Sequence, residues 1–307
     1  MSQTQRLLLI APPAMTRTPA FDRAAALALA MQLPLHIVAF DYLQALAVAG
    51  LFASEQMSLA RDGYLQSHRQ WLAEQAASMS QQGVEVTSEV VWVQHPYEEV
   101  LHYVNEMPLV LIIKDAQEES ALKRVFFTPL DWQLLRDCPA PVHLVTNAVH
   151  PRPRNVLAII DVLRSEDQDH VFNDQIIDAA AKLAALCDAR LDLVHVYDWT
   201  AIYAQDIGFG ALPMATGIYE ALGAAQHEAF AAIAERHGVP PQDRHFIEGS
   251  PLTSICDFVA EHHTDIIVMG TVQHYGLNKL LGTTAEQLLH RAPCSVLAIK
   301  PGRALQS

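Results

Sequence analysis

Glycine and threonine residues follow an apolar run near the C-terminus, and their types suit the binding of an anion. The run DIIVMG ends at Gly270, and the stretch TVQHYGLNKLLGTT that follows it ends in Gly282, Thr283 and Thr284. Glycines let backbone N–H groups approach a phosphate, and the helix N-terminus expected next adds a favourable dipole. The placement after a strand and before a helix makes a phosphate site one interpretation of the pattern. In the alternative interpretation, Gly270 and Gly282 only shape the strand exit and the helix entry.

Composition and charge exclude several classes of partner. The chain has 307 residues, 51% of them hydrophobic, which is enough for large cores and about two domains. A formal net charge of −14 without a basic cluster argues against binding to nucleic acid or to an anionic membrane surface. The N-terminal apolar run is too short for a signal peptide or a membrane span, so we expect a cytoplasmic protein.

The chain reads as two copies of one domain. HPYEEVLHYVNE aligns with SPLTSICDFVAE, LVLIIKD with DIIVMGT, WQLLRDCPAPVHLV with EQLLHRAPCSVLAI, and LHIVAFD with LVHVYD. The four blocks keep their order, and their offset drifts by only three residues. We therefore expect domains at residues 1–147 and 154–307, joined by a linker that contains two prolines.

Each copy alternates short apolar runs with longer periodic segments. Runs rich in Val, Ile and Leu are typical of strands covered by helices on both faces, so the pattern predicts a doubly wound parallel sheet. The expected strands are 6–12, 35–40, 86–93, 109–114 and 141–145, then 155–161, 190–198, 244–249, 265–271 and 295–300. The expected helices are 21–33, 56–82, 96–106 and 128–137, then 173–187, 217–237, 250–263 and 283–292.

These blocks together resemble the universal stress protein family. GTTAEQLLHRAPCSVLAIKP in the second copy and TPLDWQLLRDCPAPV in the first are similar to the tandem, E-type members of Gram-negative bacteria. The resemblance implies two tandem α/β domains with doubly wound five-stranded parallel sheets, of the adenine nucleotide alpha hydrolase-like class. It also implies a stress-response protein that binds or senses a small-molecule ligand and has no catalytic residues. The domains are expected to pair through 142–145 and 296–299 as a pseudo-dimer, with further homo-dimerisation as an option.

The resemblance also assigns the glycine segment a ligand. Nucleotide-binding members carry G-x-x-G-(x)9-G-[ST] around the phosphates of ATP, and an aspartate at the position of Asp161 contacts the adenosine end. Here Gln273 replaces the second glycine, the span is one residue shorter, and Gly276 stands out of register. ATP or AMP binding is therefore expected in the second copy only. The residues expected to carry it are Asp161, Gly270, Gly276, Gly282, Thr283 and Thr284.

The first copy lacks these features. Ala11 stands where Asp161 would be matched, and no glycine lies between Lys114 and Pro129. The acidic residues of this segment would repel phosphate; they are Asp115, Glu118, Glu119 and, further on, Asp131. We predict that this copy binds no nucleotide. For its cations, Lys114, Lys123 and Arg124, a solvated charged loop is favoured over an anion site.

Two long apolar segments, 41–57 and 198–223, follow the second strand of each copy. Water-exposed loops are seldom so apolar, which points to a ligand or a partner. One hypothesis is a hydrophobic cavity or lid formed by Ile202, Tyr203, Phe209, Leu212 and Met214. In that reading the protein is a binding module for an apolar metabolite or a protein partner. Ordinary packing between the copies is the alternative.

Catalytic and metal-binding patterns are weak. No hydrolase motif is present, so an enzyme is not expected, although a weak ATPase remains an alternative. His262 and His263 are adjacent and cannot easily share a metal, while His36 and His195 suit core positions. We expect no metal. Asp41 and Asp198 end the second strands, where they would contact a ligand or cap a helix. The four cysteines are expected to be buried thiols.

Overall fold

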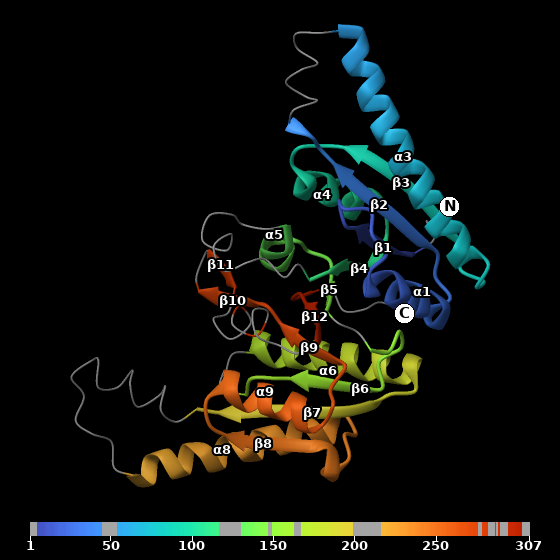
Figure 1. The fold of residues 1–307 in the computed structure, drawn as a ribbon. Coiled ribbons are helices and arrows are strands. Elements are labelled where there is room, and N and C mark those ends of the chain that lie inside the picture. The colour runs from blue at the N-terminus through green and yellow to red at the C-terminus, as the bar shows by residue number, and fades with distance from the viewer. Residues whose placement is uncertain are drawn as a thin grey trace. The chain divides into compact units, whose positions relative to one another are not determined.

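The computed structural model describes residues 5–44, 54–116, 130–146, 149–162, 167–198, 216–275, 278–281, 286, 288 and 294–302. The chain divides into two compact units, Met1–Arg152 and Pro153–Ser307. Among the described residues, each unit contributes five parallel strands flanked by helices (Figure 1). The predicted tandem α/β fold is thereby confirmed.

In the first unit the strand order is β3-β2-β1-β4-β5. The strands are β1 (Arg6–Ala11), β2 (Leu35–Asp41), β3 (Val86–Trp92), β4 (Leu109–Asp115) and β5 (Val142–Val145). The helices are α1 (Pro19–Met31), α3 (Ser54–Ser80), α4 (Pro96–Glu106) and α5 (Leu130–Asp137). The chain reverses its direction of strand addition between β1 and β4, which is the point where doubly wound sheets bind ligands.

The second unit repeats this order as β8-β7-β6-β9-β12. Its parallel strands are β6 (Asn155–Ile159), β7 (Arg190–Tyr197), β8 (Arg244–Glu248), β9 (Ile266–Gly270) and β12 (Ser295–Ile299). Its helices are α6 (Asp167–Cys187), α8 (Thr216–Arg236), α9 (Pro251–Glu261) and the 3-10 turn η1 (Pro241–Asp243). An antiparallel hairpin, β10 (Val272–Tyr275) with β11 (Asn278–Leu281), was not expected from the sequence.

Burial of both sheet faces explains the apolar runs. Every residue of β2 is buried, and β1 is buried from Leu7 onward, as expected for strands that helices cover on both sides.

Helix α6 begins six residues before the expected Asn173, whereas α4 has the expected bounds. Within the described ranges, no helix combines the length and hydropathy that crossing a bilayer requires.

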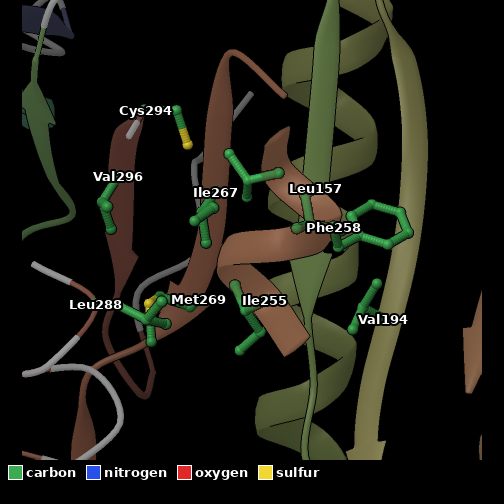
Figure 2. Packing of buried hydrophobic residues seen from close by; sticks show 10 residues of the cluster. Leu157, Val194, Ile255, Phe258, Ile267, Met269, Leu288, Cys294 and Val296 are labelled. Carbon is green, nitrogen blue, oxygen red and sulfur yellow. The ribbon is translucent and has the colours of Figure 1, made fainter. Parts of the chain in front are cut away.

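Figure 2 shows the hydrophobic cluster on one face of the sheet in the second unit, where Ile255 and Phe258 of α9 point toward side chains of the sheet. Leu157, Ile267 and Met269 belong to this cluster. Successive strand residues face opposite sides, so the buried residues between them, such as Val156 and Val268, face α6 instead. Helices α6 and α9 therefore fix the central strands from opposite faces.

Backbone conformations at the helix ends also repeat. Gln32 after α1 and Asp188 after α6 both adopt the left-handed conformation, with φ of 55° and 54°. Gly83 after α3 and Gly238 after α8 likewise have positive φ, at 95° and 67°. Such residues end a helix by turning its last carbonyls toward new donors. The duplication inferred from sequence blocks thus extends to turns that the blocks did not include.

A buried histidine joins three elements of the first unit. His36 of β2 lies 2.7 Å from the Thr87 hydroxyl and 2.9 Å from the Glu89 carboxylate, and the Tyr103 hydroxyl donates to Glu89 at 2.6 Å. Burial lowers the pKa of His36 below its usual value of 6.5, although Glu89 favours the charged form. The neutral ring donates from Nε2 to Glu89 and accepts from Thr87 at Nδ1.

This network predicts a stability loss on acidification. Since the pKa of His36 is lower in the folded chain, the unfolded chain binds the proton first as pH falls below 6.5. We expect the free energy of unfolding of the wild type, relative to His36→Gln, to decrease between about pH 7.5 and about pH 5.5. Urea unfolding of both chains at each pH measures this difference. A difference independent of pH would contradict it.

Candidate functional site

Gly270 ends β9 and lies directly against α6. A Cβ atom on this residue would come within 2.4 Å of the Phe172 ring and 3.2 Å of Ile176. Carbon atoms attract at about 3.5–4 Å and repel strongly well below that distance. Any other residue would therefore require the Phe172 ring, or α6 with it, to move. Close helix packing is therefore one role of this glycine, and it was not expected from the sequence.

The segment after Gly270 differs from the expected glycine loop. Val272 pairs with Leu281, and Tyr275 pairs with Asn278, in the β10–β11 hairpin. Backbone N–H groups in this ladder are used between the two strands and are not all available to a phosphate. Pairing also returns Leu281, which precedes Gly282 in the chain, to a position beside Val272. The two ends of the segment therefore start from neighbouring backbone positions.

Asp161 lies at the same edge of the sheet as Gly270. Strands β6 and β9 pair in parallel, with Ile159 opposite Met269, so the two residues follow neighbouring strand ends. The Asp161 carbonyl accepts from the Asn173 amide at 2.7 Å, and its N–H donates to the same side chain at 3.3 Å. Helix α6, which carries Phe172 and Asn173, thus holds both strand ends.

A buried lysine lies at this edge, and it was not among the site residues predicted from the sequence. Lys300 follows β12, is only 4% exposed, and donates from Nζ to the Thr271 hydroxyl at 2.8 Å. Thr271 follows Gly270 directly, so a positive charge lies beside the first glycine of the segment. The signal was available in the sequence, because a lysine ends a buried apolar run both in SVLAIK and in LVLIIK.

Several predicted residues lie outside the described part of the chain. These are Gly276, Gly282, Thr283 and Thr284 of the expected phosphate site. The predicted apolar cavity or lid, formed by Ile202, Tyr203, Phe209, Leu212 and Met214, also lies outside it. Both assignments stay predictions. Of the six expected nucleotide-binding residues, the structure brings together Asp161 and Gly270.

The first unit has a different arrangement at the aligned position, where Lys114 matches Gly270. Lys114 is 6% exposed, and its ammonium group lies 2.7 Å from a carboxylate oxygen of Asp131 in the first turn of α5. The expectation of a solvated Lys114 was therefore wrong, because the β4 strand carries this side chain inward. Thr18 donates to the adjacent Asp115 at 2.5 Å, while burial raises the pKa of that carboxyl. Lys123 and Arg124 lie outside the described residues.

Asp41 also departs from its expected roles. It is 2% exposed and lies 2.5 Å from His68 Nδ1, while the Tyr64 hydroxyl donates to it at 3.4 Å. Both partners belong to the middle of α3, so Asp41 does not cap that helix. Tyr64 and His68 stack at 4.1 Å between ring centroids. The carboxylate fastens α3 to the end of β2.

Histidines do not form a metal site in the residues that can be assessed. No group of three or more His, Cys, Asp or Glu side chains suited to a metal occurs among them. His36 and His195 are 6% and 1% exposed, as expected for core positions, and His262 stacks on Phe258 at 3.9 Å. Cys138, Cys187 and Cys294 are buried thiols, whereas Cys256 is partly exposed.

One protein family matches most of this chain. The pattern of the universal stress protein family matches residues 12–146 and 154–300. Universal stress protein E of Escherichia coli (strain K12) is 27% identical over 98% of this chain and 95% of that protein. The Universal stress protein E homolog of Haemophilus influenzae is 27% identical over 83% of each chain.

Solved structures show the same fold. A universal stress protein from Archaeoglobus fulgidus DSM 4304 covers 98% of this chain and 100% of its own, with a TM-score of 0.60 and 17% identity. A functionally unknown protein from Pseudomonas aeruginosa PAO1 covers 98% and 93%, with a TM-score of 0.67 and 23% identity. At these identities the likeness concerns the fold alone.

The packing at Gly270 gives a double-mutant prediction. Gly270→Ala should destabilise the second domain by about 1–3 kcal/mol, because the added methyl group overlaps Phe172. In a Phe172→Ala background the same substitution should cost at least about 0.5 kcal/mol less. Denaturant unfolding, combined with hydrogen exchange of β9, measures both effects.

Gly63→Ala is the matched control. This helical glycine has nothing within 4 Å of an added Cβ, so alanine should be neutral or stabilise by up to about 1 kcal/mol. Equal costs of Gly270→Ala with and without Phe172 would refute the steric explanation.

Proposed function

Because the chain belongs to the universal stress protein family, we propose that it is a stress-response ligand-binding protein whose nucleotide site lies in the second domain. The ligand is ATP or AMP, bound at the carboxyl edge of β6 and β9. Binding alone, without turnover, is the activity. The first domain binds no nucleotide and serves as the structural partner of the second.

The observation that carries this proposal is the burial of the Lys300 ammonium group beside Gly270 and Thr271. The Lys300 ammonium group contributes positive charge at this edge, and positive charge favours an anionic ligand such as a nucleotide phosphate. The position is also the carboxyl end of parallel strands, where doubly wound sheets bind ligands.

The neighbouring backbone supports the same site. Because Val272 pairs with Leu281, the residues before and after the hairpin leave it from adjacent backbone positions. We therefore assign Thr271 and the 282–284 run to the binding of one phosphate group. Asp161 is exposed at the end of the adjacent strand and is suited to the ribose or the base. Its backbone is held by Asn173.

The other functions stay predictions without a specific observation in their favour. An apolar-ligand module depends on segments 41–57 and 198–223, which lie largely outside the described residues. A weak ATPase needs a group that activates water, and no observation on the described residues assigns that role. Pairing of the domains through 142–145 and 296–299, further dimerisation and a cytoplasmic location are likewise predictions.

Calorimetric titration with ATP tests the proposal. Lys300→Met should weaken ATP binding by about tenfold or more, since a hydrogen bond to a charged group contributes about 1.5–3 kcal/mol. Lys182→Met is the control, because this lysine lies in the C-terminal half of α6, toward the opposite edge of the sheet. Heat of ATP binding that is absent in the wild type, or unchanged in Lys300→Met, would contradict the proposal.

A further inference from the structure

An ammonium–carboxylate pair lies at the carboxyl edge of the first domain. Lys114 and Asp131 approach to 2.7 Å, and their side chains are only 8% and 13% exposed. The Lys114 ammonium also donates to the Asp115 carbonyl at 3.0 Å. The pair therefore lies between the end of β4 and the first turn of α5. In a parallel α/β domain, this is where a ligand anion would meet a helix N-terminus.

Comparison of the two copies shows that the pair itself is peculiar to the first domain, since Gly270 is aligned with Lys114. Both domains bury an ammonium group at this edge, Lys114 in the first and Lys300 in the second, with exposures of 6% and 4%. The residue aligned with Asp131, however, is Ala285 in the second copy. Each edge thus has a buried cation, carried by different strands in the two copies, and the carboxylate of Asp131 is specific to the first domain.

We propose that the first domain contains an oxyanion site that Asp131 holds closed by occupying it with its own carboxylate. The tethered carboxylate has a high effective concentration at Lys114, so free phosphate cannot compete with it. Its place in the first turn of α5 is favourable, because a helix N-terminus stabilises negative charge. The ligand class that fits the vacated position is a tetrahedral oxyanion such as inorganic phosphate.

This inference goes beyond the proposed nucleotide site, because it concerns the other domain and other residues. It also offers a different physical reason for the prediction that the first domain binds no nucleotide. The sequence suggested general repulsion by several acidic residues. The structure adds a specific contact, because Asp131 pairs directly with the cation that a phosphate would use, and the Asp115 carboxylate lies within electrostatic range of the same lysine.

Removal of the carboxylate tests the inference. In Asp131→Ala the Lys114 ammonium loses the carboxylate that contacts it at 2.7 Å, while Asp115 stays nearby, and we expect phosphate to bind at least about tenfold more tightly than to the wild type. Hydrogen exchange localises the effect: added phosphate should slow exchange in peptides covering 109–115 and 130–137 in the variant alone. Sodium chloride at matched ionic strength is the reference.

Two further variants keep the test decisive. The Lys114→Met/Asp131→Ala double variant removes the cation as well and should lose the phosphate response. Asp131→Asn retains nearly the same shape without the charge, so it provides a folded alternative if the alanine variant unfolds, and it should gain a weaker response. Phosphate protection absent from both single variants, or unchanged in the double variant, would overturn the proposal. A response confined to β9 and β12 would also overturn it, since it would place the phosphate in the second domain.

Discussion

Parallel strand pairing places the carboxyl ends of all five strands of a domain at one edge, and the two domains differ chiefly in how they occupy that edge. Both bring a lysine side chain into it, and a buried ammonium group requires hydrogen-bond acceptors or negative charge nearby. In the first domain Asp131 meets this requirement at 2.7 Å. In the second, Lys300 donates to the Thr271 hydroxyl beside the glycine segment. Both copies therefore place positive charge at this edge, beside a carboxylate in the first domain and beside the glycine segment in the second.

Helix α6 is the element that makes the second edge. Its Phe172 closes on Gly270, and the adjacent Asn173 binds the backbone of Asp161 in both directions. The helix can pack closely on the strand end because glycine has no side chain that would overlap with Phe172. Gly270 thus serves the packing of α6, and this use is compatible with the backbone access that we propose for a ligand.

Much of the fold could be predicted from the sequence, because it depends on local periodicity and on the repeat. The apolar runs identify the strands, and the proline pair Pro96 and Pro251 marks the first turns of α4 and α9. The β10–β11 hairpin was missed because its strands are only four residues long and lie in a segment interpreted as a loop. The Gly-Leu pair between them was the available signal for a two-residue turn.

The candidate site could be predicted less well from the sequence, because its contacts join residues far apart in the chain. Nothing near Lys114 in sequence indicates that Asp131 will reach it, and nothing near Gly270 indicates Phe172. Such pairs follow from tertiary packing, which local patterns do not encode. The repeat contained a signal for the pair, since its alignment places Lys114 against Gly270 and Asp131 against Ala285. Two charged residues of opposite sign therefore replace uncharged residues at the same edge.

The most direct test of the central claim is the number of nucleotides bound per chain at saturation, measured by equilibrium dialysis of the full-length protein against ATP. One ATP per chain agrees with an open edge in the second domain and an edge closed by its own carboxylate in the first. Two per chain, or none, would contradict the account.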